Sequence, residues 1–583
     1  MKDKFSKLKV RRAGVSVPLL SILTKNSFES GDIHSLKLFG DWAKQCGLSI
    51  IQILPLNDLG YGKSPYSSIS AFAVDPIYIS LYMLGINRTS RSDRIKTLKI
   101  NHNRIKELKL KILKYHFLKK YNPKLKKELD KFLNEHNFLN SFGVFKILYE
   151  KNLGKHWSEW GKDSKYSEAL CKKVIKTNEE DFYFQIWMQK VAFEQLKEIK
   201  KYLESIGVYL KGDMPILTSG NSADVWEKTH LFDLSLNSGA PPDAFSADGQ
   251  NWGFPVINWN AMKKENFSWW KDRIQYIENF YHLYRIDHVL GMYRIWAVPI
   301  KVKKARMGYF HPQTGASVEE FKEVHLDPKE FVKKKIIYEF SKGKFAFHWD
   351  FYLSKEYNSF EEDTKRKLYE LSVKHLEKDE SNWRKNGEEI LDFLMHNSNM
   401  LPCAEDLGVV PEFVRDSIHE KKIIGLDIIR WTRSFSDGSY IRPQDYRENA
   451  VSSLSVHDTS IGIAWWNELK EDEKRKAMEF TGIKEDYTIH QIIERLLEIS
   501  LSTKSIFSIN LLHDFLFEGK ICRLENTKKH LFQKPNKHRI NIPGTPEEEN
   551  WSYRFSFFLE DLLHEDILNS KIKKIVKKSK RLN

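Results

Sequence analysis

Eight short apolar runs recur along the chain, and most of them are followed by a segment with helical spacing. The clearest covers residues 48–56, where a nearly continuous apolar pattern is typical of a parallel strand buried on both faces. Strands that alternate with helices favour a parallel sheet, and eight of them favour an α/β protein built on a (β/α)8 TIM barrel. An open doubly wound sheet lacks support, because no Gly-x-Gly-x-x-Gly turn follows the first run. The predicted strands lie near residues 14–19, 48–56, 207–213, 284–290, 400–406, 424–430, 451–457 and 505–510.

Long charged stretches separate some of these strands. Residues 81–203 are rich in lysine and helical in spacing, and residues 301–399 are charged and mostly helical in pattern. We expect a single catalytic domain over residues 1–583, in which both stretches form helical insertion subdomains in the βα connections. Between them, residues 219–255 are rich in glycine and proline, which predicts a long loop.

Acidic residues lie at the C-terminal ends of four of the predicted strands: Asp213, Asp287, Glu405 and Asp458. In a (β/α)8 barrel the C-terminal ends of the strands meet at one face, where such enzymes assemble their active sites. Each acid alone could be a helix cap or a surface charge. Because each ends an apolar run, the set as a whole predicts an active site at that face.

Arg285 and Asp287 are two residues apart in the apolar segment of residues 284–291. In a strand this spacing points both side chains to one face, so the guanidinium is expected to keep the carboxylate ionised. An ionised, oriented carboxylate can act as a covalent nucleophile. A buried structural ion pair explains the same two residues, and this segment alone leaves both interpretations open.

Glycoside cleavage with retention of configuration requires two carboxyl groups, one that attacks the anomeric carbon and one that donates and then accepts a proton. Asp287 is the candidate for the first task. Glu405 is the candidate for the second, because the apolar approach of residues 402–404 favours a protonated carboxyl group. A third acid, Asp458, can favour an oxocarbenium-like transition state. His457 or Asp458 can bind a sugar hydroxyl from the turn after its strand.

Composition and charge argue against several other classes of function. The formal net charge is +16, but the lysines are spread through helical stretches and no zinc-finger, RNA-recognition or basic-zipper spacing occurs, so no nucleic-acid partner is expected. The four cysteines lie far apart, which suits a reducing compartment, and no metal-ligand spacing or other cofactor motif is present. The basic first residues lack a convincing signal peptide and no apolar run is long enough to span a membrane, so a cytoplasmic protein without a membrane partner is the default.

Ten short motifs follow one another along the chain: residues 51–56, 64–72, 212–215, 222–226, 239–255, 285–288 (Arg-Ile-Asp-His), 404–408 (Ala-Glu-Asp-Leu-Gly), 457–458, 539–545 and 550–551. This ordered set resembles the amylomaltases, also called disproportionating enzymes. These are the 4-α-glucanotransferases of glycoside hydrolase family 77 in the α-amylase superfamily. Each motif alone is weak, whereas their order and their spread from residue 13 to about residue 562 are highly specific.

The resemblance implies a role for each matching residue. Asp287 matches the nucleophile, Glu405 the general acid/base and Asp458 the transition-state stabiliser. The other matches imply substrate binding: Arg285, Asp213 and His457 around the sugar at the cleavage point, Tyr66 and Trp252 as aromatic residues lining the cleft, Gln250 and Asp243 in a loop that covers it, and Asn541 near the acceptor end.

The implied activity is transfer of a segment of an α-1,4-glucan, or maltodextrin, to the 4-hydroxyl of an acceptor glucan or glucose through a covalent glucosyl-enzyme. Exclusion of water by residues 243–253 would favour a sugar as the acceptor. The alternatives are a retaining α-glucan hydrolase of the same superfamily and a catalytically silent glycan-binding protein.

The sequence departs from the family pattern near this site. Ala244 stands where a tyrosine is common, Phe254 replaces a common asparagine, and Val289 replaces the usual phenylalanine after residues 285–288. Residues 459–460 and the length of residues 301–399 look closer to the longer disproportionating-enzyme branch. We expect these differences to affect chain-length preference more than reaction type.

Overall fold

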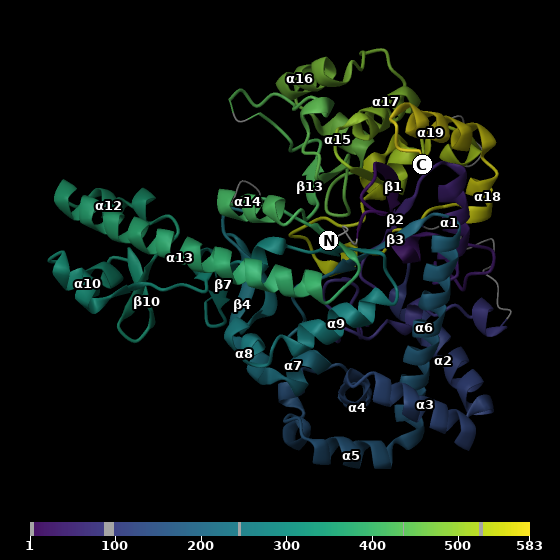
Figure 1. Ribbon diagram of the computed structural model, residues 1–583, viewed down its shortest axis with the longest axis horizontal. Helices are drawn as coiled ribbons and strands as arrows, with labels where there is room; N and C mark the ends of the chain where they lie inside the picture. The colour runs from purple at the N-terminus through teal and green to yellow at the C-terminus, as the bar shows by residue number, and fades with distance from the viewer. Residues whose placement is uncertain are drawn as a thin grey trace.

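The predicted barrel is present in the computed structural model, which describes residues 5–86, 98–242, 246–302, 304–434, 436–523 and 529–582 (Figure 1). Eight parallel strands follow one another in chain order, and a parallel bridge between Cys403 and Ile424 closes the ring. All eight match predicted strands, which confirms the (β/α)8 fold class. They are β1 (Arg12–Ser16), β2 (Ile50–Gln52), β3 (Tyr209–Met214), β6 (Leu283–Ile286), β12 (Leu401–Ala404), β13 (Gly425–Ile428), β14 (Ala450–Ser453) and β15 (Phe507–Leu511).

Side chains alternate across the barrel wall. In β2, Ile50 belongs to an apolar cluster shared with β6, β12, β14 and β15, which can meet only inside the ring. Its neighbour Ile51 belongs to the larger core between the strands and the surrounding helices. Because both faces of the strands are buried, their sequences read as continuous apolar runs and could be recognised without a tertiary structure.

Helices cover the outside of the barrel (Figure 1). Trp42 in the first of them is fully buried, and its Nε1 donates to Oδ1 of Asn569 in the last at 2.9 Å, so the two ends of the chain pack together. These outer helices are α1 (Ser35–Gln45), α9 (Ser268–Glu278), α14 (Glu412–Glu420), α15 (Gly462–Glu468), α16 (Glu471–Thr481), α17 (Ile489–Ser502), α18 (Leu559–Leu563) and α19 (Asp566–Lys578).

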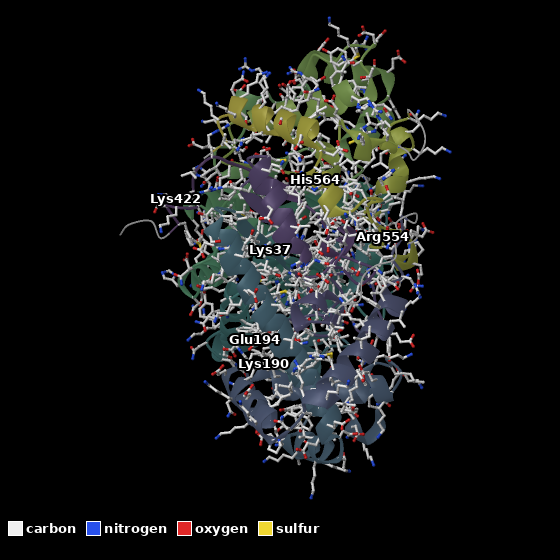
Figure 2. The ribbon with its side chains drawn as sticks, turned by 90° about the vertical axis from the view of Figure 1, so that its right-hand side faces the viewer. Lys37, Lys190, Glu194, Lys422, Arg554 and His564 are labelled. Atoms are coloured by element: carbon white, nitrogen blue, oxygen red, sulfur yellow. The ribbon has the colours of Figure 1, made fainter. Side chains whose placement is uncertain are left out.

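The connection between β2 and β3 contains α2 (His102–Lys120), α3 (Pro123–Glu135), α4 (Phe138–Lys151), α5 (Glu168–Thr177) and α6 (Glu179–Ser205). Nζ of Lys106 on α2 lies 2.8 Å from Oδ1 of Asp58 and 2.7 Å from Oδ2 of Asp75, and Nζ of Lys146 on α4 lies 3.0 Å from Oδ2 of Asp58. Both aspartates are buried, so these lysines anchor the loop after β2 to the helices. The outer face of α6 is charged, as Lys190 and Glu194 illustrate (Figure 2).

An antiparallel sheet lies where residues 219–255 were predicted to form a loop. Its strands are β4 (Phe232–Ala240), β5 (Gln250–Ile257), β7 (Ile295–Pro299) and β8 (Tyr309–His311), with the short helices α7 (Ala223–Glu227) and α8 (Trp259–Lys264) beside them. The loop prediction is therefore wrong for β4 and β5. Glycine marks a close approach here, because a Cβ atom on Gly239 would lie 1.9 Å from the carbonyl oxygen of Gln250.

The stretch between β8 and β12 has a second apolar core of its own, to which Phe321, Phe331 and Phe345 contribute. It contains a small sheet that the helical pattern of residues 301–399 did not predict, and it lies at the far left of Figure 1. Its elements are β9 (Ala316–Ser317), β10 (Ile337–Ser341), β11 (Lys344–Phe347), α10 (Val318–Glu323), α11 (Pro328–Lys333), α12 (Lys355–Asn358) and α13 (Glu362–His396). Among the described helices, none has the length and apolar character needed to cross a bilayer.

Candidate active site

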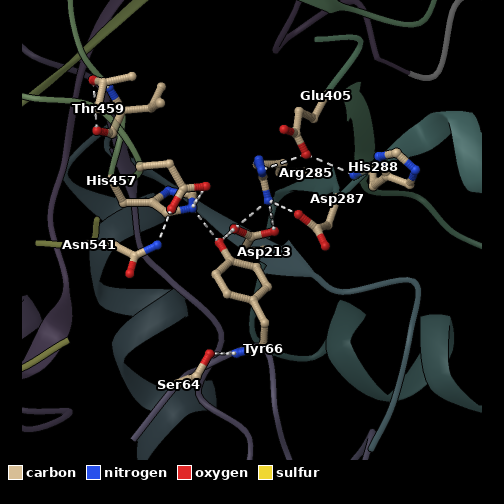
Figure 3. Close-up of polar contacts among 12 residues, drawn as sticks. Ser64, Tyr66, Asp213, Arg285, Asp287, His288, Glu405, His457, Thr459 and Asn541 are labelled. Carbon is tan, nitrogen blue, oxygen red and sulfur yellow. Dashed lines mark hydrogen bonds and ion pairs between the residues drawn. The ribbon is translucent and has the colours of Figure 1, made fainter. Parts of the chain in front are cut away.

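Polar residues from several strand ends meet at one end of the barrel (Figure 3). Parallel pairing of β6 with β3 sets Arg285 directly opposite Asp213, and pairing of β6 with β12 brings the end of β12 to the same place. The acids predicted at strand ends are thus brought together. The group consists of Asp213 in β3, Arg285 in β6, Asp287 just after it, Glu405 just after β12, and His457 and Asp458 in the loop after β14.

Arg285 is the centre of this group and is almost completely buried. Its Nη1 lies 2.8 Å from both carboxylate oxygens of Asp213 and 2.8 Å from Oδ1 of Asp287. Its Nη2 lies 2.8 Å from Oε2 of Glu405. Only Asp287 was the partner predicted from the sequence. Charge-assisted hydrogen bonds of the length seen to Asp213 and Asp287 are among the strongest in proteins, and the ion pair with Glu405 adds a third carboxyl group to those that Arg285 holds.

The ionisation of Asp287 differs from the prediction that Arg285 would simply keep it charged. Burial raises the pKa of Asp287 well above the usual range of an aspartate, and the nearby Glu405 and Asp213 raise it further while Arg285 lowers it. A single guanidinium balances the charge of only one of the three carboxyl groups that it contacts. Asp287 therefore takes up a proton at a higher pH than it would in an isolated pair with Arg285.

The side chains of Asp287 and Glu405 are 22% and 20% exposed, and each has one carboxyl oxygen without a partner among the described residues. Oε2 of Glu405 forms an ion pair with Nη2 of Arg285 and accepts a hydrogen bond, at 2.8 Å, from the backbone N–H of His288, whereas its Oε1 has no partner among the described residues. Asp287 uses Oδ1 for Arg285, and its Oδ2 is likewise without a partner in the described parts of the chain. The backbone of His288 is left-handed, with φ 41° and ψ 57°, a conformation that is uncommon for non-glycine residues, and its N–H is the group that donates to Glu405.

A second hydrogen-bonded group lies beside the first. Oη of Tyr66 donates to Oδ2 of Asp213 at 2.9 Å and lies 3.0 Å from Nε2 of His457. That Nε2 lies 3.3 Å from Oδ2 of Asp458, and Nδ2 of Asn541 donates to Oδ1 of Asp458 at 2.6 Å. Burial opposes ionisation of Asp458, but His457 and Asn541 outweigh it and lower its pKa to about 2. Burial also lowers the pKa of His457, but Asp458 raises it more, so the pair favours a carboxylate facing an imidazolium.

A cavity of about 650 Å³ is lined by members of both groups, a size typical of ligand sites. Trp252 belongs to its wall and packs edge-on against the ring of His288, with ring centroids 5.0 Å apart. Nε1 of Trp252 donates to Oε1 of Gln250 at 3.1 Å, so these two predicted residues lie together. Asp243 and Ala244 lie outside the described residues.

Some residues of the site were not singled out from the sequence. His288 belongs to one of the motifs, but the motif does not reveal that its backbone is left-handed. Asp406, which could have been a surface charge, is buried, lies 2.6 Å from Nη1 of Arg447, and accepts at 2.7 Å from the backbone N–H of Leu426 in β13. It therefore fixes the backbone next to Glu405. Among the described residues, no group of His, Cys, Asp or Glu side chains is arranged to hold a metal ion.

The fold and the site together define a (β/α)8 enzyme equipped for nucleophilic and acid–base catalysis. The sequence pattern of the 4-alpha-glucanotransferase family, glycoside hydrolase family 77, matches residues 17–560. The 4-alpha-glucanotransferases of Chlamydia pneumoniae and Chlamydia muridarum are 30% and 31% identical to this chain, over 97% and 96% of it and 95% and 93% of their own lengths. A solved amylomaltase from Streptococcus agalactiae, in complex with acarbose, covers 98% of this chain and 100% of its own at 23% identity, with a TM-score of 0.74. The chain therefore belongs to glycoside hydrolase family 77, the 4-alpha-glucanotransferases.

Proposed function

We propose that this protein transfers a segment of an α-1,4-glucan to the 4-hydroxyl of an acceptor glucan or glucose. The observation that carries the proposal is the sharing of Arg285 by Asp287 and Glu405, each of which keeps one carboxyl oxygen without a partner among the described residues. A nucleophile and a proton donor held by one rigid guanidinium form the pair of carboxyl groups that retaining glycoside chemistry requires.

In the first step, Oδ2 of Asp287 attacks the anomeric carbon of the donor while Glu405 gives its proton to the glycosidic oxygen. The bond between that carbon and oxygen breaks, and the reducing-end fragment leaves with a free 4-hydroxyl. The glucosyl unit remains bound to Asp287 as an ester.

In the second step, the 4-hydroxyl of an acceptor gives its proton to Glu405, and its oxygen displaces Asp287 from the anomeric carbon. Glu405 is then protonated again and Asp287 is free. Two inversions at the same carbon retain the α configuration. No outside acid or base is consumed, because Glu405 returns to its starting state in each cycle.

Residues around the transferred glucose are proposed to bind its hydroxyls and to favour its positively charged transition state. Asp458 suits this task because His457 and Asn541 keep it ionised next to the reacting pair. The remaining proposed contacts are Arg285, Asp213, Tyr66 and His457 around the transferred glucose, Trp252 on the cavity wall, Gln250 hydrogen-bonded to Trp252, and Asp243 in the segment that follows β4.

Incubation with maltotriose as the only substrate tests the proposal. Transfer gives free glucose together with a ladder of longer maltodextrins. Glucose and maltose without longer products would instead support a retaining hydrolase, and binding without any products would support a silent glycan-binding protein. The variant Asp287→Asn is expected to lose transfer by at least about 10⁴-fold while it still binds maltodextrin.

We also propose that the protein works on maltodextrins derived from starch or glycogen in the cytoplasm, without a nucleic-acid or membrane partner. The four cysteines, all buried and unpaired, suit a reducing compartment. The basic residues are dispersed over many helices and often paired with acids, as in the ion pair between Lys190 and Glu194. Absence of RNA or DNA binding at low salt is the expected result of a direct test.

A further inference from the structure

One part of the cavity wall comes from the stretch between β6 and β12 rather than from the barrel. Trp349 lies in the turn between β11 and the segment that leads to α12, lines the cavity, and is 41% exposed. Phe310 in β8 lines the cavity next to it. Trp349 is thus a partly exposed aromatic residue on the wall of a cavity that Glu405 and Asp458 also line, and hydrophobic and aromatic side chains are the main lining of ligand pockets.

Trp349 is held in a fixed orientation. Its ring packs edge-on against Phe310, with centroids 5.2 Å apart, and against Trp296 in β7, with centroids 6.1 Å apart. Phe310 is fixed in turn by the guanidinium of Arg294, whose Cζ lies 3.7 Å from the ring centroid. An ion pair between Arg306 and Asp350 ties the next residue of the turn to the segment before β8. The open face of Trp349 is therefore presented by a rigid support, which limits the entropy lost on binding.

Phe310 and Trp296, the residues that hold Trp349, place it on the Glu405 side of the cavity. β7 and β8 follow directly after His288, which donates to Glu405, and they precede the strand that leads to Glu405. Tyr66 and Asp458 come from the loops after β2 and β14, which lie elsewhere in the ring of strands. In the proposed reaction Glu405 protonates the departing oxygen, so its side of the cavity holds the leaving fragment and then the acceptor.

We propose that Trp349 is a stacking platform for a glucose unit of the leaving fragment and of the acceptor, on the Glu405 side of the cleavage point. This inference rests on the proposed transfer function. The flat apolar face of a glucose ring fits an indole face, and hydroxyls at its rim remain free to bind water. A platform contributed by the stretch between β6 and β12 makes that stretch a determinant of chain-length preference, because only a sufficiently long glucan reaches it.

Calorimetric titration of maltoheptaose and of maltose into the inactive variant Asp287→Asn tests this platform without any transfer. Adding Trp349→Ala to that variant is expected to weaken maltoheptaose binding roughly fivefold, as expected for loss of one aromatic stacking contact, and to change maltose binding much less. Trp349→Phe keeps an aromatic face and is expected to stay within about twofold of the parent. Tyr352→Ala, a half-exposed aromatic residue of the same segment that does not line the cavity, is the matched control and should leave both affinities unchanged.

Equal maltoheptaose affinity with and without Trp349→Ala would overturn the platform, and so would an equal loss for maltose and maltoheptaose. If Trp349→Ala reduces folding, Trp349→Leu keeps an apolar side chain without an aromatic face and gives the same comparison. The maltotriose assay on the unmodified protein separately reports the transfer function. A protein that transfers normally but binds maltoheptaose equally well without Trp349 would refute only the platform.

Discussion

Replacement of Arg285 gives the sharpest test of the site, because this one side chain joins three carboxyl groups. In Arg285→Lys the single ammonium group can stay near Asp213 and Asp287, but it cannot also provide the second nitrogen that binds Glu405 at 2.8 Å. Loss of this ion-pair contact to Glu405 is expected to cost about 1.5–3 kcal/mol, the range for polar contacts that involve a charged group. If the contact positions Glu405 for proton transfer, kcat/KM should fall about 10- to 150-fold.

Arg285→Met tests charge rather than geometry. Arg285 lowers the pKa of Asp287, so its removal raises a pKa that burial, Glu405 and Asp213 already raise. Asp287 must be ionised to attack, and the acidic limb of the pH profile of kcat/KM reports the ionisations of the free enzyme. That limb should therefore move to higher pH in Arg285→Met and move less in Arg285→Lys, which keeps a positive charge.

The measurement for both variants is the initial rate of glucose release from low concentrations of maltotriose between about pH 5 and pH 9, the range in which such limbs usually lie. Arg366→Lys, at an exposed position on α13 where the arginine pairs with Asp363, is the matched control and should behave like the parent. A rate within twofold of the parent for Arg285→Lys, or an unmoved acidic limb for Arg285→Met, would refute the assignment of Arg285 as the shared support.

Two further predictions concern the proton donor and the loop after β2. Glu405→Gln should lower transfer from maltotriose by about 10²–10⁴-fold, but it should give a burst of fluoride from α-maltosyl fluoride, because fluoride leaves without a proton and the base for the second step is missing. An equal loss with both donors would contradict this role. Lys106→Met should lower the free energy of unfolding by about 3–5 kcal/mol, since it leaves the carboxylates of Asp58 and Asp75 buried without their shared cation. The urea midpoint measures this, and Lys111→Met on the exposed face of α2 should leave it unchanged.

The barrel could be predicted from the sequence because its strands are buried on both faces, so each one is an apolar run long enough to recognise. The antiparallel strands β4 and β5 could not, since glycine, proline and irregular register hide the alternation that marks a half-exposed strand. The small sheet of β9, β10 and β11 was not predicted either, because the sequence around it is charged and mostly helical in spacing.

The candidate site, like the fold, has features that the sequence predicted and features that it could not predict. The two-residue spacing of Arg285 and Asp287 placed them on one face, and the positions of the acids predicted that they meet at one end of the barrel, as they do. The sequence by itself singled out the residues that are proposed to carry the chemistry, because residue type and strand periodicity are local properties. Only the tertiary structure decided that Arg285 is shared with Asp213 and Glu405, that the pKa of Asp287 is raised rather than lowered, and that Trp349 lines the cavity. These features depend on distances between segments far apart in the chain, and such distances are set when the ring of strands closes and the connections pack against it.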